Sequence, residues 1–246
     1  MTVVRFKAMR KPQFVNDYVY HLFNRGVEKR KIFMDDDDYF RFIQNLYEFN
    51  DENPVTNFGY FFNPRSMNVE FRATRALKKE RPPRKRLVEI LVFTLMPNHF
   101  HLLIRQKARD GIVRFMQKLG TGYTMYFNQK YKRVGGLFQG RFKGVLIISQ
   151  EHFEYLPHYI HLNPLELIYR GSTSIDWRGK IKSLEDYRWS SFPDYIGKAN
   201  FPSVTHREYL LDMFAGEKQY KKDAVSILKE RFFSQNKELM QDVVID

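Results

Sequence analysis

Met96-Pro97-Asn98-His99-Phe100-His101-Leu102-Leu103-Ile104 is the stretch that decides the fold, and the apolar run Leu91-Val92-Phe93-Thr94-Leu95 precedes it directly. The pattern predicts a strand, a short turn and a second strand. Side chains at positions i and i+2 of a strand point to the same face. We therefore expect His99 and His101 to project together, where two neutral imidazoles can hold one divalent cation. For this motif taken alone, a pair of half-buried histidines without a ligand is the alternative.

The composition sets the broad class of the protein. The chain has 246 residues, 43% of them hydrophobic, which is enough for one large domain or one domain with an appendage. No apolar run is long enough to span a bilayer and no segment resembles a signal peptide, so we expect no membrane association. The absence of cysteine excludes disulfides and thiolate metal sites and favours a reducing cytoplasm.

The charge indicates a nucleic-acid partner. Lys and Arg number 41 against 28 Asp and Glu, a net charge of +13, and aromatic residues make up 16% of the chain. Cations bind phosphates and aromatic rings stack on unpaired bases. A basic surface that is only solvated is the weaker alternative, and the sequence shows no convincing basic amphipathic helix for a membrane surface.

The predicted elements alternate in an order that gives the fold class. The first six match a split βαβ arrangement, an α+β fold of ferredoxin-like type with an antiparallel sheet and helices on one face. The helices have the expected caps, Asp35 or Asp36 for the first, Asp110 for the second and Ser149 for the third. The elements are a strand at 17–24, a helix to about 50, strands at about 87–96 and 100–106, a helix from 110 to about 131, a short buried strand at 145–148 and a helix from 149 to about 162.

Two regions lie outside this pattern. Residues 51–86 look like an insertion that is rich in proline and cations, and a mobile loop over a nucleic-acid groove or a solvated linker would both explain it. We expect a core domain at 14–195 and a helical C-terminal extension at 196–246, with two polar helices within 205–246. The cations of the insertion are Arg72, Arg75, Lys78, Lys79, Arg81, Arg84, Lys85 and Arg86.

The helix after the last strand carries the second half of a candidate site. At 100° per residue, Phe153, Leu156 and Ile160 share the face that packs on the sheet. Tyr159 and Asn163 are four apart and stack along the neighbouring face. Taken alone, Tyr159 reads as a tyrosine at a helix edge and Asn163 as a terminator before Pro164. Pro157 is expected to remove a helical hydrogen bond and to kink the helix.

These residue types together suit one reaction. A metal held by two imidazoles and the Asn163 carbonyl keeps positions open for a phosphate oxygen and water, and acts as a Lewis acid. The phenol of Tyr159, with an ordinary pKa near 10, would attack phosphorus as a nucleophile. The resulting phosphotyrosine ester stores the bond energy, so a later 3′-hydroxyl can reverse the step without ATP.

Several motifs occur in one order that resembles a known family. His-Phe-His, Tyr-Ile-x-x-Asn-Pro and Asp-Tyr-Arg-Trp-Ser-Ser at 186–191 resemble the REP-associated tyrosine transposases. These are relatives of the single-tyrosine insertion-sequence transposases within the HUH superfamily of single-strand endonucleases. The likeness runs from about Asp17 to about Tyr195. It includes Phe23-Asn24-Arg25-Gly26, Leu95-Met96-Pro97-Asn98-His99-Phe100-His101 and Leu137-Phe138-Gln139-Gly140-Arg141-Phe142-Lys143.

The resemblance implies a mechanism and a substrate. It implies a ferredoxin-like fold, a Mg²⁺ or Mn²⁺ ion on His99 and His101, Tyr159 as nucleophile and Asn163 as third ligand. The implied substrate is single-stranded DNA with a short hairpin, cut near its foot. The insertion at 51–86, the segment after about 195 and Pro157 depart from the familiar pattern, which affects substrate details more than chemistry.

Further residues have expected roles in DNA binding. Arg141 and Lys143 can meet phosphates, although two cations on a solvated turn are the alternative. Asn24 and Arg25 are expected to read the hairpin foot. Arg188 and Trp189 would supply a cation and a stacking ring, but a tryptophan there is at least as often packing.

The sequence predicts an enzyme, a metal-dependent endonuclease and strand transferase of hairpin DNA that forms a 5′-phosphotyrosine intermediate. Tyr123 and Tyr126 are rival nucleophiles, disfavoured because no amide follows either at i+4. A domesticated hairpin binder without cleavage activity is the second hypothesis, and a replication or plasmid-transfer nickase the third. We expect a bacterial, cytoplasmic, nucleoid-associated protein that acts as a monomer or homodimer.

Overall fold

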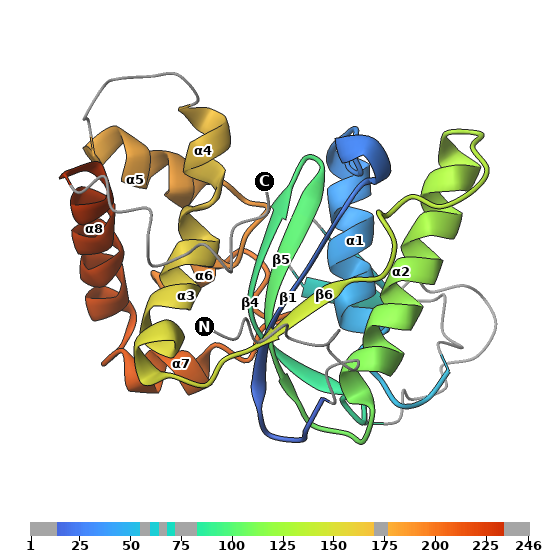
Figure 1. Ribbon diagram of the computed structural model, residues 1–246, viewed down its shortest axis with the longest axis horizontal. Helices are drawn as coiled ribbons and strands as arrows, with labels where there is room; N and C mark the ends of the chain where they lie inside the picture. Colours follow the sequence, from blue (N-terminus) through green and yellow to red (C-terminus); the bar gives the residue numbers. More distant parts are fainter. Residues whose placement is uncertain (1–13, 55–59, 64–67, 72–82, 170–176, 234–246) are drawn as a thin grey trace, which may run out of the picture.

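A four-stranded antiparallel sheet forms the centre of the molecule in the computed structural model, which describes residues 14–54, 60–63, 68–71, 83–169 and 177–233 (Figure 1). The sheet order is β4-β5-β1-β6, formed by β1 (Val19–Arg25), β4 (Val88–Met96), β5 (His99–Gln106) and β6 (Lys143–Leu146). The central pair, β1 and β5, is antiparallel, and β1 also pairs with β6. This is the predicted α+β, ferredoxin-like arrangement.

Two helices cover one face of the sheet, as predicted for the six-element core (Figure 1). In α1 (Asp36–Glu48) the Asp35 carboxylate caps the first turn by accepting from the backbone N–H of Asp38. The second helix is α2 (Gly111–Lys130), which buries an apolar stripe. Asp110 precedes this helix, but its side chain makes no capping hydrogen bond. The stripe consists of Ile112, Met116, Leu119, Tyr123 and Phe127.

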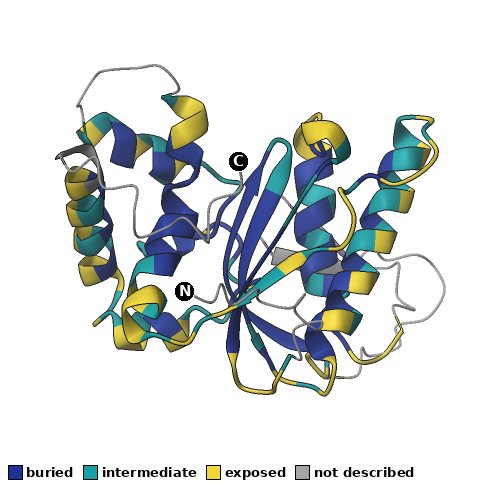
Figure 2. Cartoon of the chain, in the orientation of Figure 1, coloured by how far each residue is buried: buried dark blue, intermediate teal, exposed yellow. Residues whose placement is uncertain are grey.

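The other face of the sheet is covered by α3 (Gln150–Leu162) and the helices that follow it (Figure 1). Ser149 caps α3 as predicted, and Pro157 lies inside the helix without ending it. Burial follows this layering, because β1, β4 and β5 are largely buried while the helices are exposed on their outer sides (Figure 2). The later helices are α4 (Pro164–Ile168), α5 (Trp177–Asp186), α6 (Phe192–Tyr195), α7 (Glu208–Met213) and α8 (Glu217–Phe233).

The C-terminal helix α8 packs on the helices that cover this second face. Tyr220 and Leu228 of α8 are buried against Leu156 and Ile160 of α3 in one apolar cluster. The stretch after α5 also closes the outer edge of β4, because Trp189 O accepts from Leu95 N and Phe93 O accepts from Ser191 N. Closure of an edge strand protects it from pairing with another chain.

The last strand differs from the prediction. We expected 145–148 to be a buried strand, but β6 is an edge strand and ends at Leu146. Leu146 is 36% exposed and Ile148, beyond the strand, is 85% exposed. A short apolar run predicts a strand, but its place in the sheet depends on its partners. Among the described strands only β1 pairs with this one.

The insertion at 51–86 contains a hairpin of β2 (Tyr60–Asn63) and β3 (Asn68–Phe71). Its cations Arg72, Arg75, Lys78, Lys79 and Arg81 lie outside the described residues. Arg84, Lys85 and Arg86 lie within them, just before β4. In the part of the chain that the structure describes, no helix is long and apolar enough to cross a membrane.

Two glycines of α2 give a matched test of the packing. A Cβ at Gly111 would collide with the backbone oxygen of Leu87, whereas a Cβ at Gly120 would meet open space. Gly111→Ala should therefore lower the free energy of unfolding by about 2–3 kcal/mol, because the strand cannot move away cheaply. Gly120→Ala should raise it by about 0.5–1 kcal/mol, since alanine favours helix. Urea unfolding of both variants checks this, and equal effects of one sign would contradict it.

Candidate functional site

The histidine pair opens β5, directly after the turn that joins it to β4. Pro97 O accepts from Ile32 N at 2.8 Å and Asn98 O accepts from Gly26 N at 2.8 Å, so the turn is tied to the chain after β1. The rings of His99 and His101 lie 5.0 Å apart between centroids, at 85° to each other. Both side chains project to the face covered by α3, as strand alternation predicted, while Phe100 joins the core beneath α1 and α2.

Hydrogen bonds at Nδ1 determine which ring nitrogen each histidine offers to a ligand. His99 Nδ1 lies 2.7 Å from Asn98 Oδ1, an acceptor, so Nδ1 donates and Nε2 keeps its lone pair. His101 Nδ1 lies 2.9 Å from His21 Nε2. When His101 donates this bond, its Nε2 is likewise free to bind a metal.

His21 is a residue of this site that the sequence reasoning missed. It is fully buried, and its ring stacks on that of His101 at 5.1 Å and 13°. Its Nδ1 has no hydrogen-bond partner among the described residues. Alternation along β1 places His21 on the same face as Val19, but the register of β1 on β5, which brings it to His101, cannot be read from the sequence.

All three histidines are held in the neutral form that binds metals. Burial lowers the pKa of His21 to about 3. Burial, and then the charge of Arg25, lower the pKa of His99 to about 4. Burial and the two neighbouring histidines hold the pKa of His101 well below its ordinary value.

Tyr159 comes from α3, which lies on the histidine face of the sheet. Thr94 Oγ1 of β4 donates to Ile160 O at 2.8 Å and so fixes the helix next to the strand. The ring of Tyr159 meets the ring of His101 edge-on, with 6.4 Å between centroids. Tyr159 is only 3% exposed. Its side chain is therefore almost entirely covered by neighbouring residues.

Asn163 follows Tyr159 by one helical turn and ends α3. The residue is 4% exposed, and its Nδ2 is buried without a hydrogen-bond partner among the described residues. Within the same residues, no three His, Cys, Asp or Glu side chains form a metal-binding group, so an amide would have to complete the set. The unpartnered atom of Asn163 is a hydrogen-bond donor, which does not bind cations, so the fit of a divalent cation rests on the lone pairs of the two neutral imidazoles.

Of four predicted DNA-binding residues, Arg25 and Lys143 lie on the histidine face of the sheet, while Asn24 pairs with Phe100 and Arg141 follows in the segment before β6. Arg25 pairs across the sheet with His99, and its Nε donates to Gln139 Oε1 at 2.5 Å. Asn24 Nδ2 donates to Gly140 O at 3.3 Å. Lys143 pairs across the sheet with Phe23, whose ring lies 6.0 Å from that of His101. The fourth residue, Arg141, is exposed in the same segment.

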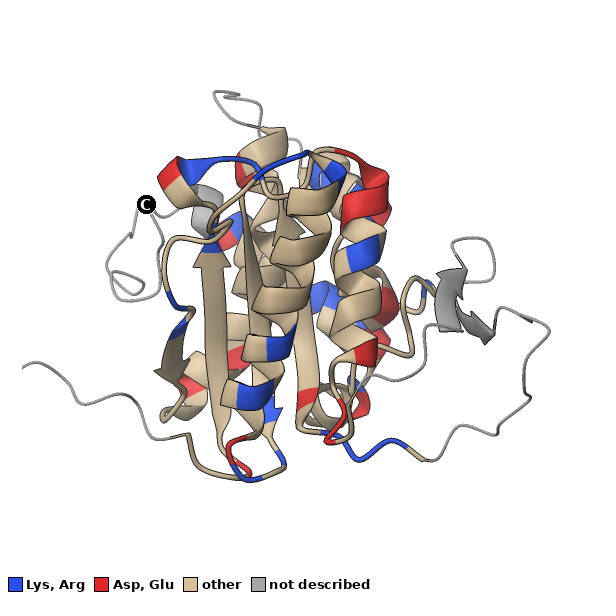
Figure 3. Ribbon diagram, turned by 90° about the vertical axis from the view of Figure 1, so that its right-hand side faces the viewer, with Lys and Arg blue, Asp and Glu red and all other residues tan. Residues whose placement is uncertain are grey.

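Arg188 and Trp189 lie apart from this group. Trp189 is partly buried and stacks on Tyr39 of α1 at 4.5 Å, with the Arg188 guanidinium 5.1 Å from its ring. This places the pair against α1, on the face of the sheet opposite Tyr159. Viewed from the side of α1 and α2, acidic residues cluster at the start of α1 (Figure 3). That end of the face is less suited to phosphates than the histidine side.

Comparison with known proteins agrees with the predicted resemblance. Residues 77–163 match the family model described as "Transposase IS200 like", and this segment contains His99, His101, Tyr159 and Asn163. A solved structure described as the "REP associates tyrosine transposase bound to a REP hairpin" is similar, with a TM-score of 0.45 and 13% identity. The match covers 80% of this chain and 90% of that one. None of the curated proteins matches the sequence.

Proposed function

We propose that this protein is a metal-dependent endonuclease and strand transferase of single-stranded hairpin DNA, of the REP-associated transposase type. The observation that carries the proposal is the contact of Tyr159 with His101, at 6.4 Å between ring centroids, inside the segment that matches the transposase family. A phenol next to a pair of neutral imidazoles is an arrangement for nucleophilic attack on a phosphate.

His99 and His101 would hold Mg²⁺ or Mn²⁺ through Nε2, and Asn163 through its amide oxygen. The ion supplies Lewis acidity at the scissile phosphate. His21 and Asn98 orient the two imidazoles through their hydrogen bonds to Nδ1. Burial keeps both imidazoles unprotonated at neutral pH, so protons do not compete for the ligand nitrogens.

The covalent step is a transesterification. Tyr159 Oη attacks phosphorus and forms a new O–P bond, while the bond from phosphorus to the 3′-oxygen breaks. The phenol proton passes to solvent, and the departing 3′-oxygen takes up a proton to become a hydroxyl. The 5′ phosphate remains on Tyr159, and the reverse reaction with another 3′-hydroxyl joins strands without ATP.

The cations beside the histidines would guide the strand into the site. Arg25, Arg141 and Lys143 offer positive charge to the phosphates, and Asn24 offers an amide. The hairpin as substrate follows from the motifs shared with the REP-associated transposases. Arg188 and Trp189 would touch DNA only where it passes the face of α1.

Labelled hairpin oligonucleotides from the DNA that flanks the gene test the proposal. With Mn²⁺ or Mg²⁺, we expect a covalent protein–DNA adduct on a denaturing gel, and none after chelation with EDTA. Cleavage without an adduct would contradict the phosphotyrosine step, and an adduct formed in EDTA would contradict the requirement for a metal ion.

A hairpin-binding protein without cleavage activity is the second candidate. The burial of Tyr159, at 3% exposure, favours it, because a binder needs no access to that hydroxyl. Tight hairpin binding with no adduct in either metal, for oligonucleotides covering both flanks of the gene, would establish this function instead.

A further inference from the structure

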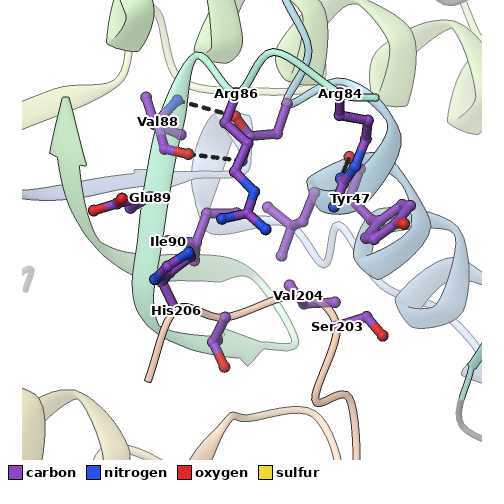
Figure 4. A pocket seen from close by; sticks show the side chains of 12 residues that line it. Tyr47, Arg84, Arg86, Val88, Glu89, Ile90, Ser203, Val204 and His206 are labelled. Carbon is purple, nitrogen blue, oxygen red and sulfur yellow. Dashed lines mark hydrogen bonds between the residues drawn. The ribbon is translucent and has the colours of Figure 1, made fainter. Parts of the chain in front are cut away.

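A pocket lies at the end of β4 that is remote from the histidines (Figure 4). Three segments build it, namely the end of α1, the start of β4 and the stretch 203–206. The space between them is small, about 20 Å³ for the centres of water-sized molecules, and it is open to solvent. His206 N donates to Ile90 O at 2.8 Å and Asn50 bonds the backbone of Val88 in both directions. The walls are therefore hydrogen-bonded to the strand.

Two arginines make the pocket cationic. Arg84 is fixed, because its guanidinium donates to Tyr47 O at 2.7 Å and lies 3.5 Å from the centre of the Tyr47 ring. The Arg86 guanidinium lies between the β4 strand and Val204 (Figure 4). Arg86 itself is exposed, so its charge is available to a ligand from solution.

The carboxylate that borders the pocket does not neutralise it. Glu89 forms an ion pair with Arg105 of β5, and its Oε2 accepts from Arg105 Nε at 2.6 Å. The Glu89 carboxylate points away from the Arg86 guanidinium (Figure 4). The pocket therefore keeps a net positive charge, to which the partly exposed ring of His206 adds a hydrogen-bonding group.

Thr205 provides an independent sign of a ligand. Its side chain lines the pocket and is 7% exposed, and its Oγ1 is buried without a hydrogen-bond partner among the described residues. Buried hydroxyls in folded proteins are nearly always hydrogen-bonded. An acceptor that enters the pocket would satisfy this hydroxyl, and an anion would also meet the arginines.

We propose that this pocket binds a phosphodiester group of the DNA substrate, with Arg84 and Arg86 as cations and Thr205 as hydroxyl donor. A guanidinium fork and a hydroxyl match the oxygens of a phosphate. The inference rests on the proposed function, because it identifies a second contact of the same DNA. The inference also gives a role to the arginines that precede β4.

The spacing of the two sites sets the length of DNA that reaches both. Val88 and Met96 are eight residues apart on one strand, which is roughly 26 Å at about 3.3 Å per residue. With a rise of about 3.4 Å per base pair along the duplex axis, this corresponds to roughly eight base pairs. A hairpin stem of that length would contact the pocket while its foot lies at the histidines.

Fluorescence anisotropy with labelled hairpin DNA, measured over a series of KCl concentrations, tests the pocket. Arg86→Gln should weaken binding about five- to tenfold near 0.15 M salt and reduce the salt slope by about one. Thr205→Val should weaken binding about threefold, while its melting temperature stays equal or rises because an unpartnered hydroxyl is removed. Lys85→Gln is the matched control, since exposed Lys85 is adjacent to Arg86 but does not line the pocket. It should change affinity less than twofold.

Two outcomes would overturn the inference. Arg86→Gln and Thr205→Val could both bind within twofold of the wild type, or Lys85→Gln could lose as much as Arg86→Gln, which would indicate a general basic surface. If the wild type binds no hairpin DNA, the proposed function fails. A titration with inorganic phosphate then tests whether the pocket binds an anion. A saturable shift of the Thr205 methyl NMR signal, absent in Arg86→Gln, supports the pocket, and an unshifted signal or an equal shift in both proteins refutes it.

Discussion

Replacement of Tyr159 by phenylalanine is expected to abolish the covalent adduct with hairpin DNA, reducing its rate of formation by at least about a thousandfold. The variant keeps the ring that packs against His101 and loses only the hydroxyl that would attack phosphorus. Binding of the hairpin and of Mn²⁺ should stay within about threefold of the wild type. A denaturing gel measures the adduct, and anisotropy and calorimetry measure the binding.

Tyr155 provides the matched control for this experiment. It lies one turn earlier on α3, is partly exposed and has its ring 6.4 Å from that of Tyr159. Tyr155→Phe removes the same atom from the same helix, and we expect at least half of the wild-type adduct. If Tyr155→Phe were as inactive as Tyr159→Phe, the loss would reflect the helix and not the nucleophile.

An adduct that survives Tyr159→Phe would move the chemistry to another tyrosine. The structure makes the two rivals poor nucleophiles, because both belong to α2 on the opposite face of the sheet. Tyr123 is fully buried and donates its hydroxyl to Ile32 O at 2.5 Å, and burial raises its pKa. Tyr126 donates to Asp38 Oδ1 at 3.0 Å.

Acid is expected to destabilise the protein steeply below about pH 6.5. Burial lowers the pKa of His158 to about 4 and that of His161 well below its ordinary value of 6.5. The unfolded chain takes up these protons as the pH falls through 6.5, whereas the folded chain does not until the pH reaches the lowered pKa. The contribution of these buried neutral histidines to the free energy of unfolding is therefore fully present above pH 6.5. It falls on acidification by about 1.4 kcal/mol per pH unit for each histidine.

The expected size of this effect rivals the whole stability of a domain. His21, His99 and His101 are shifted in the same direction, so five histidines contribute. At pH 5 each of these histidines lowers the free energy of unfolding by about 2 kcal/mol, and all five together lower it by roughly 10 kcal/mol. The whole free energy of unfolding of a domain is typically about 5–15 kcal/mol. Urea unfolding at pH 7.5, 6.5, 5.5 and 5.0 measures this dependence.

His158 gives the sharpest variant for the acid prediction. Neither of its ring nitrogens has a hydrogen-bond partner among the described residues, and its ring stacks on Tyr220 at 4.3 Å. His158→Phe should keep the stacking and reduce the slope of stability against pH by about 1.4 kcal/mol per unit below 6.5. Equal slopes for His158→Phe and the wild type would contradict the prediction.

The local geometry of the candidate site could be predicted from the sequence. Alternation on a strand placed His99 and His101 on one face, and the period of a helix placed Asn163 one turn after Tyr159. The element order gave the α+β class for the same reason, because spacing along the chain determines which side chains share a face.

Only the tertiary structure decided what these elements meet. The register of β1 on β5 brings His21 to His101, and the packing of α3 on the second face brings Tyr159 there. Trp189, for which the sequence left DNA stacking and packing open, lies against α1, and Thr205, which the sequence did not mark, lines a pocket beside Arg86. Strand register, the choice of sheet face and the docking of α8 depend on contacts between residues far apart in the chain, which local periodicity does not encode.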